Sequence, residues 1–479
     1  MMKVLHGFKS GILSILAVFL MLGLVSCGGG VTGSGSGSTG SVALLLTDAT
    51  TDEFSQVNIT ITRAELIADS LKVTILSTTK TVDLLSLSDE TNLFALSSGV
   101  PSGWYEKIRL HVSDIELVRK DGTIIHPMIS GNGKLDLNPR EKFYVESGGT
   151  LLLQVDLDAN KSIHIVNTGH GDKYNFRPVV FIDVLDGQTR GKLLRLYGQV
   201  RDINTDDQKF ELCPKETLSR AAYTYGSGYV DAQNNVTECV AVYSSPATSF
   251  FDANGDPAAF ADLADGDLVT AVGNVRIDTS SVHEHNMGLD AVVVEWGQFL
   301  RIEGIAKSLP DALTGRFDLE VFSGQGFPSG TVLTVELQDG ARVYSATGEE
   351  LTEADIEGGL KVKVDGVLFL SDTEPDILKA SFAVVFKQPF LPLLELEGVV
   401  HNLNTAGRSF DLFDPLSSTA RCVDVPLSAR VFLITVVGSD YVSEEIALSE
   451  LSENQSVQVY GNNGSTCFTA QTILAEPLL

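Results

Sequence analysis

The sequence reads Leu194-Arg195-Leu196-Tyr197-Gly198 at the start of a segment that occurs twice more, as Leu300-Arg301-Ile302-Glu303-Gly304 and Leu394-Glu395-Leu396-Glu397-Gly398. Each stretch alternates apolar and polar side chains and ends in Gly, which is typical of a strand that bends at its end. A Phe-acid-Leu triplet follows each stretch, at residues 210–212, 317–319 and 410–412. The spacing fits a β-hairpin, so the period predicts three copies of one β-rich domain.

Each copy continues in the same order after its hairpin, with a third strand, a short acidic turn and two further strands. Five short strands, an early Gly bend and a turn between the third and fourth strands are typical of a small closed Greek-key barrel of the OB type. We therefore expect three OB-like barrels, at residues 193–297, 299–388 and 393–479.

The copies resemble an uncharacterised repeat domain of bacterial envelope lipoproteins that is expected to be OB-like. The resemblance runs from Leu194 to Leu479 and implies neither a ligand nor a catalytic residue. OB barrels often bind oligonucleotides or oligosaccharides through aromatic side chains on one face. Strand aromatics are sparse here, so we expect a spacer or scaffold role, with saccharide or peptide binding as the alternative.

The composition narrows the class of protein. A chain of 479 residues needs more than one hydrophobic core. Its 34 basic and 62 acidic residues give a net charge of −28, and a field of that sign repels phosphate backbones, which argues against a nucleic-acid partner. With 43% apolar and 20% charged residues the chain should fold, and its 44 Gly and 15 Pro predict an all-β protein with many turns.

The first 27 residues are typical of an export signal. Lys3 and Lys9 precede the apolar run 11–25, which is too short for a comfortable membrane span. The run ends in Leu24-Val25-Ser26-Cys27, which resembles the bacterial lipobox and implies that the Cys27 thiol carries diacylglycerol. The alternative is an ordinary signal peptide cut near Ser26. An acylated Cys27 would anchor the protein stably in a membrane.

Two features follow Cys27. Gly28 stands where an Asp would signal inner-membrane retention in proteobacterial lipoproteins, so the resemblance implies the outer membrane, with the domains facing the periplasm or the cell surface. Residues 28–41 read GGGVTGSGSGSTGS and have no apolar face to bury. We expect a flexible tether there.

Five cysteines are an odd number for an exported protein, and lipidation of Cys27 leaves Cys213, Cys239, Cys422 and Cys467. Four cysteines allow three pairings. Because each repeat that contains cysteines contains two, we expect the local disulfides 213 to 239 and 422 to 467, which an oxidising periplasm permits. No C-x-x-C spacing occurs and no His lies close to either pair, which argues against zinc.

Residues 42–186 form a further domain. Val57, Ile59 and Ile61 alternate with polar residues, as in a half-buried strand, and similar runs recur between turn signals, so a β-sandwich is expected. The segment resembles a domain of unknown function that is common after the lipobox and similar to transthyretin-like and carbohydrate-binding-like sandwiches. The residues that carry the resemblance are Thr47-Asp48-Ala49, Trp104 to Leu110, Val155 to Asp158 and Tyr174 to Val179.

Two groups of residues could bind metal ions. Asp156 and Asp158 begin a D-x-D-x-N pattern, but Lys161 stands where an EF-hand needs Gly. A looser calcium site formed by Asp48, Asp156 and Asp158 remains a candidate, against the simpler interpretation of solvent-facing acids. His283-Glu284-His285 could place two imidazoles on one face of a strand, although a third ligand is lacking and an exposed hairpin tip explains it as well.

Two adjacent aromatic residues are the candidate ligand-binding residues. Trp104 and Tyr105 could form a platform on which a sugar ring stacks, or could instead belong to the core or a strand edge.

No G-x-S-x-G motif occurs, so we expect no enzyme and no cofactor other than the calcium considered above.

The sequence therefore predicts a lipid-anchored envelope protein that acts without catalysis as a structural, adhesive or ligand-presenting module. Its expected partners are the membrane, through the anchor, and a polysaccharide or an envelope protein. The alternatives are a glycan-binding protein and a calcium-dependent adhesin.

Overall fold

The computed structural model describes most of the chain from residue 38 onward. The described residues are 38–48, 54–69, 71–129, 133–139, 141–167, 172–176, 180–185, 191–214, 239–277, 286–322, 327–328, 330–370, 376–387, 394–415, 417–437 and 440–478. The predicted signal peptide with Cys27, most of the tether, and His283-Glu284-His285 lie outside them. Residues 39–479 form one compact unit. Within the described residues, no helix combines the length and the apolar character needed to cross a membrane.

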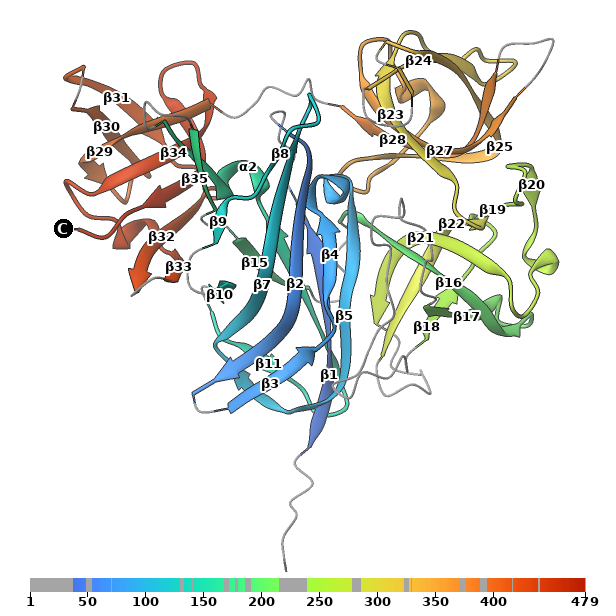
Figure 1. Ribbon diagram of the computed structural model, residues 1–479, viewed down its shortest axis with the longest axis horizontal. Helices are drawn as coiled ribbons and strands as arrows, with labels where there is room; N and C mark the ends of the chain where they lie inside the picture. The colour runs from blue at the N-terminus through green and yellow to red at the C-terminus, as the bar shows by residue number, and fades with distance from the viewer. Residues whose placement is uncertain are drawn as a thin grey trace, which may run out of the picture. The chain divides into compact units, whose positions relative to one another are not determined.

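The fold is all-β, as the sequence predicted, and its N-terminal domain packs two layers of strands around one core (Figure 1). One layer has the order β15-β12-β1-β5, formed by Val180–Leu185, Thr150–Leu157, Thr39–Thr47 and Glu90–Pro101. The other has the order β3-β2-β7-β10, formed by Leu71–Leu76, Phe54–Ala68, Lys107–Arg119 and Lys134–Asn138. β4 (Lys80–Asp83) pairs with β2, and β8 (Ile124–Ile125) pairs with β7.

The strand β1 begins at Thr39, so residues 39–41 belong to the sheet and not to the tether predicted there. Thr39 and Gly40 pair with β5, and Ser41 pairs with β12. The run that follows is buried on both faces, which explains why it reads as nearly continuous apolar sequence. Its even-numbered residues, with Leu44 among them, face the sandwich core, and Leu45 faces the core of the first barrel.

Short elements complete this domain. They are the ribbon of β6 (Gly103–Tyr105) and β11 (Phe143–Val145), the small sheet of β9 (Met128–Ile129), β13 (Ile163–Asn167) and β14 (Asp172–Phe176), the 3-10 turn η1 (Leu84–Leu87), and the single helical turn α2 (Ala159–Ser162).

The first barrel contains β16 (Leu193–Asn204), β17 (Lys209–Pro214), β18 (Val240–Tyr243), β19 (Ser249–Phe251), β20 (Pro257–Ala258), the 3-10 turn η3 (Phe260–Asp262), β21 (Leu268–Ile277) and β22 (Met287–Trp296). β16 pairs with β17, and β17 pairs with β18. β18 runs parallel to β22, β22 pairs with β21, and β21 pairs with β16. The sheet is therefore closed.

The second and third sheets close in the same order. The second contains β23 (Leu300–Ala306), β24 (Arg316–Val321), β25 (Val332–Ser345), β26 (Glu350–Leu351), η4 (Glu353–Asp355), β27 (Lys361–Phe369) and β28 (Ile377–Phe386). The third contains β29 (Leu394–Asn404), β30 (Ser409–Asp414), β31 (Thr419–Asp424), β32 (Arg430–Val437), β33 (Asp440–Ile446), η5 (Leu448–Glu450), β34 (Ser456–Asn463) and β35 (Phe468–Ala475). In each barrel a further strand pairs back on the strand before it, β20 on β19, β26 on β25 and β33 on β32. β33 is longer than β20 and β26.

The Gly that ends each opening stretch lies where two strands come close together. A Cβ atom on Gly198 would lie 2.3 Å from the carbonyl oxygen of Cys213, and one on Gly304 would lie 2.3 Å from that of Glu320. Any larger residue would push the second strand of the barrel away from the first, so these positions require Gly.

The domains are joined by strand pairing and by apolar contacts. β16 of the first barrel lies parallel to β5 of the sandwich, and β33 of the third barrel lies parallel to β10. One apolar cluster contains residues of the first and second barrels, with Phe251 and Phe382 among them, and another places Phe181 of the sandwich against Phe432 of the third barrel. Residues 39–479 are therefore held together by more than their linkers.

Candidate functional site

The two aromatic residues predicted as a sugar platform lie on opposite faces of β6. Neighbouring residues of a strand alternate between faces, and Trp104 is 61% exposed whereas Tyr105 is 1% exposed. Tyr105 donates its hydroxyl proton to the carbonyl oxygen of Pro101 at 2.8 Å and stacks on Phe143 with the ring centroids 6.1 Å apart. Tyr105 is a core residue, so its assignment to the platform was wrong.

Tyr144 takes its place on the exposed face. It lies directly across from Trp104 in the ribbon of β6 and β11, is 44% exposed, and has its ring centroid 5.2 Å from that of Trp104. The buried Tyr105 and Phe143 fix the other face of the same ribbon, so the exposed pair stands on a supported base. The alternation Phe143-Tyr144-Val145, buried, exposed and buried, is the sequence signal that could have identified it.

The three predicted calcium ligands lie near the ends of two neighbouring parallel strands. Thr47 of β1 is in register with Asp156 of β12, and Asp48 and Asp158 follow just beyond. The backbone N–H of Lys161 donates to Oδ1 of Asp158 at 3.0 Å, and its ammonium pairs with Oδ2. Both oxygens of Asp158 are therefore already engaged.

A second ammonium group lies among the same acids. Lys192 Nζ donates to Thr47 Oγ1 at 2.8 Å and to the carbonyl oxygen of Asp48 at 2.7 Å. Burial raises the pKa of Asp156 to about 6, with Lys192 opposing the shift, and burial also lowers the pKa of Lys192. Calcium needs six or more oxygen ligands. Lysine ammonium groups thus lie among these acids, while Oδ2 of Asp48 and Oδ1 of Asp156 are buried without a hydrogen-bond partner among the described residues, and the calcium site stays a prediction.

A larger buried cluster of charges lies where the sandwich and the first two barrels meet. Arg195 of β16 donates to both carboxylate oxygens of Glu90 at 2.8–3.0 Å, pairs with Asp365 of β27, and lies 3.6 Å from Glu295 of β22. Arg301 of β23 lies 3.1 Å from Glu90 and 3.1 Å from Asp365. Asp89, Glu90, Arg195, Glu295 and Asp365 are all buried.

The electrostatics of this cluster follow from its burial. Burial and the neighbouring Asp365 raise the pKa of Glu295 to about 8, which Arg195 and the hydroxyl of Ser381 oppose. The pKa of Asp89 is lowered to about 2 because Lys363 and Arg301 outweigh the effect of burial. With Glu295 protonated, the acids Asp89, Glu90 and Asp365 face an equal number of cations, Arg195, Arg301 and Lys363. An arginine within the apolar run 193–196 was the only sequence signal for it.

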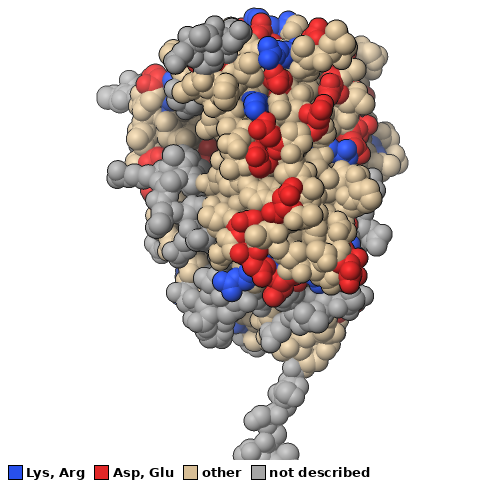
Figure 2. All heavy atoms as spheres, turned by 90° about the vertical axis from the view of Figure 1, so that its right-hand side faces the viewer, with Lys and Arg blue, Asp and Glu red and all other residues tan. Residues whose placement is uncertain are grey.

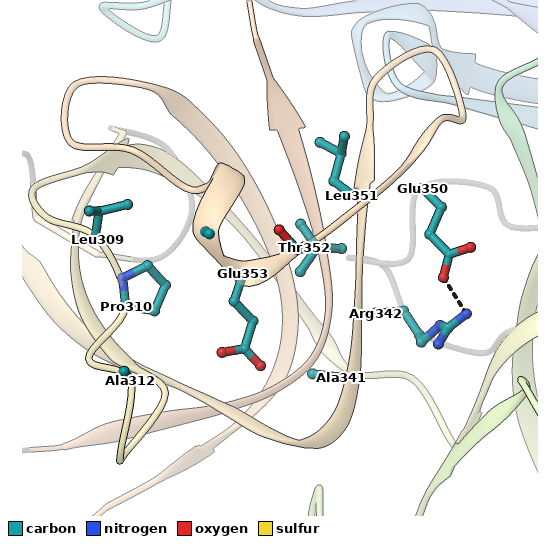
Figure 3. Close-up of a pocket in the computed structure, with 11 residues that line it drawn as sticks. Leu309, Pro310, Ala312, Ala341, Arg342, Glu350, Leu351, Thr352 and Glu353 are labelled. Atoms are coloured by element: carbon teal, nitrogen blue, oxygen red, sulfur yellow. Dashed lines mark hydrogen bonds and ion pairs between the residues drawn. The ribbon is translucent and has the colours of Figure 1, made fainter.

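Two surface grooves occupy equivalent places in the second and third barrels. The groove of the second barrel has a volume of about 530 Å³ and lies between the β23–β24 loop and η4 (Figure 3). That of the third barrel has about 390 Å³ and lies between the β29–β30 loop and η5. Each is bordered by an Arg–Glu ion pair, Arg342 with Glu350 at 2.6 Å and Arg430 with Glu445.

Three histidines in the described part of the chain contact an acid or an aromatic ring through their side chains. His111 Nε2 lies 2.8 Å from Glu65, His126 Nδ1 lies 3.1 Å from Asp114, and His401 packs edge-on against Phe413. None of these three contacts involves a Ser or Cys nucleophile.

The cysteines form the disulfides expected from their spacing, Cys213–Cys239 and Cys422–Cys467. In the described part of the chain, Cys422, Asp424 and Cys467 lie close enough to suggest a metal site. Their two sulfurs are bonded to each other, so this group offers no thiolate to a metal.

Comparison with known proteins identifies part of the chain. The model of a family described as a domain of unknown function (DUF4382) matches residues 39–178. The chain therefore contains a DUF4382 domain, which starts with β1 and covers most of the sandwich. No curated protein and no solved structure matches the chain.

Proposed function

We propose that this chain is a lipid-anchored, non-catalytic protein of the bacterial cell envelope, in which a sandwich and three copies of an OB-like domain act as one rigid structural, adhesive or ligand-presenting module. The buried cluster around Arg195 is the observation that carries the rigid-module part of the proposal. Glu90, Glu295 and Asp365 come from three different domains and share one guanidinium, so these domains cannot separate without leaving charges unpaired.

The repeat part of the proposal is supported by topology. All three closed sheets have the strand order expected of an OB barrel, and each has a 3-10 turn between its third and fourth strands. Acidic side chains recur along the face shown in Figure 2, where basic ones are fewer. Together with the net charge of −28, they favour a protein or carbohydrate partner over a nucleic acid.

The anchoring part of the proposal is tested in cells. We expect an inhibitor of lipoprotein signal peptidase to cause accumulation of precursor, and Cys27→Ser to release the protein from the membrane fraction. Fractionation should place the wild-type protein in the outer membrane. Unchanged mobility under the inhibitor, with a soluble mature form, would refute lipidation of Cys27.

Glycan binding is the second candidate function, and the exposed pair of Trp104 and Tyr144 favours it. Sugar rings stack on exposed aromatic side chains, and this pair adds two such rings on a fixed ribbon. We expect Trp104→Ala and Tyr144→Ala each to weaken binding on a glycan array. Ile124→Ala, which removes an exposed apolar side chain from β8, is the matched control. If the wild-type protein binds none of the polysaccharides, glycan binding is excluded and the structural role stands.

A further inference from the structure

The chain enters the sandwich beside the ribbon of β6 and β11. The carbonyl oxygen of Thr39, where β1 begins, accepts a hydrogen bond from the backbone N–H of Gly148 at 2.8 Å. The N–H of Ser41 donates to the carbonyl oxygen of Gly149, also at 2.8 Å. These glycines follow Val145, the last residue of β11. The start of β1 is therefore fixed at one end of β11.

The other strand of the ribbon lies at the same end of the sandwich. Thr39 is in register with Pro101, and β6 begins two residues later. The hydroxyl of Tyr105 donates to the carbonyl oxygen of Pro101, which holds the ribbon against β5. Figure 1 shows β11 beside the end of β1 at which the chain enters. The exposed pair of Trp104 and Tyr144 thus lies next to the point where the chain leaves toward its N-terminus.

Large apolar side chains are exposed at this end. Trp104 is 61% exposed, Tyr144 is 44% exposed, and Leu71, at the start of β3, is 43% exposed. The backbone N–H of Glu106 donates to the carbonyl oxygen of Ile67 at 2.8 Å, which holds the turn between β2 and β3 beside β6. Trp and Tyr are enriched where a membrane meets water, because the ring contacts apolar lipid while the N–H or O–H stays in the polar layer. The side chains at this end are therefore of the kind that a membrane surface accepts.

The charged side chains at this end do not select an anionic surface. Asp69, Glu141 and Glu146 are exposed, and so are Lys72 and Lys142. An anionic membrane would repel the acids at least as much as it attracts the lysines. Burial of apolar surface, and not charge, is therefore what a membrane contact at this end would provide, and uncharged lipid is sufficient for it.

The length of chain before β1 sets how far this end can lie from a membrane anchor. Residues 28–38 separate Cys27 from Thr39. A Gly/Ser coil of this length spans about 20 Å on average and about 40 Å when fully stretched. The sandwich is longer than the average reach of this tether, because the 13 residues of β7 alone span about 40 Å. The anchor therefore keeps the ribbon closer to the membrane, on average, than the opposite end of the sandwich.

We propose that the sandwich rests on the membrane through this end, with the rings of Trp104 and Tyr144 inserted at the level of the lipid headgroups. The inference deepens the proposed lipid anchoring and rests on it. Tyr105 and Phe143 are buried behind the pair, so the two rings enter on a rigid base. The acylated Cys27 supplies most of the membrane affinity, and the ribbon sets the orientation of the domain. The pair then faces a lipid surface in place of the glycan considered above.

The two tryptophans of the chain make this contact measurable. Trp104 lies in the ribbon, whereas Trp296 ends β22, whose ten residues span about 30 Å from Asn286. Asn286 itself lies near the ribbon end, because its backbone N–H donates to Thr150 Oγ1 at 2.9 Å. The lipidated full chain is reconstituted in phosphatidylcholine vesicles with or without brominated acyl chains, which quench tryptophan emission on contact. We expect brominated lipid to lower the emission of Trp296→Phe about twofold or more and to leave that of Trp104→Phe unchanged.

A third tryptophan position is the matched control for exposure. Ile124 of β8 is 55% exposed, and β8 pairs with the last residues of β7, at the end of the sandwich opposite to the ribbon (Figure 1). Ile124→Trp, in a chain that also carries Trp104→Phe and Trp296→Phe, should emit without quenching by brominated lipid. The wild-type chain should lose part of its emission, which keeps the test open if Trp296→Phe does not fold.

Flotation of the vesicles separates failure of the anchor from failure of the contact. A full chain that does not float with the vesicles refutes the lipid anchor and the inference with it. A chain that floats, but whose Trp104 emission is the same in brominated and plain lipid, overturns the inference and leaves the anchor standing. The inference is also overturned if Ile124→Trp is quenched as strongly as Trp104, or if a polysaccharide shifts Trp104 emission while brominated lipid does not.

Discussion

Substitution of Arg195 by Met is the sharpest perturbation of the domain junction. Met keeps much of the volume of the side chain but removes the guanidinium that faces Glu90, Glu295 and Asp365. Arg301 still lies 3.1 Å from Glu90 and from Asp365, so these two acids keep one cation. Glu295 loses the only ion pair that the structure describes for it.

The magnitude follows from burial. Removal of one partner from a buried ion pair costs about 3–5 kcal/mol, because the remaining charge stays away from water without compensation. Because Glu90 and Asp365 keep Arg301, and Glu295 with a pKa of about 8 is mostly protonated at pH 7, we expect a loss at the lower end of this range at pH 7. Arg195 opposes the rise of the pKa of Glu295 to about 8, so its removal raises that pKa further. Deprotonated Glu295 therefore destabilises the variant more than the wild type, and the deficit should be larger at pH 9 than at pH 7.

Urea unfolding followed by tryptophan fluorescence measures the effect. Trp296, at the end of β22 in the first barrel, reports on the domain that contains Arg195. The matched control is Arg201→Met, which removes an exposed guanidinium from the same strand and should change the free energy of unfolding by less than about 0.5 kcal/mol. If Arg195→Met unfolds at the wild-type midpoint, or if its deficit does not depend on pH, the cluster does not hold the domains together.

Three further predictions test other parts of the structure. Glu295→Gln should flatten the pH dependence of the free energy of unfolding. Because the pKa of Glu295 is raised to about 8 in the folded state, its protonation stabilises the wild type fully below pH 4.5, and this stabilisation is lost as the pH rises through about 8. Urea midpoints of both proteins at pH 6 and pH 9 measure the difference. Replacement of both Cys422 and Cys467 by Ser should lower the free energy of unfolding by up to about 4 kcal/mol, the chain-entropy value for a 45-residue separation, so an unchanged urea midpoint would contradict it. Tyr105→Phe should cost about 1 kcal/mol in thermal unfolding through the lost hydrogen bond, and a neutral result would argue against the hydrogen bond to Pro101.

Local patterns predicted much of the fold. The alternation of Val57, Ile59 and Ile61 identified a half-buried strand, and all three side chains lie in the sandwich core. The recurrent Gly after each opening stretch reflects a close approach of two strands, as Gly198 shows. Both features depend on residues within a few positions of each other, so they can be found without the tertiary structure.

The candidate sites were harder to predict because they depend on which side chains of a strand are buried and on contacts with residues far away in the sequence. The period of two in β6 required Trp104 and Tyr105 to face opposite ways, but only the packing of Tyr105 on Phe143 decided which of them is buried. The acids Asp48, Asp156 and Asp158 do lie near one another. Lys192, which no sequence pattern places there, supplies one of the cations that lie among these acids.

The sequence by itself determined the all-β class, the two disulfides and the order of strands in the repeats, because each rests on spacing within one domain. The tertiary structure alone decided the junction at Arg195, whose partners Glu90 and Asp365 lie 105 and 170 positions away. It also decided which of Trp104 and Tyr105 is buried. Burial decides both features. Burial depends on the whole fold, because the residues that exclude water from a side chain lie far from it in the sequence.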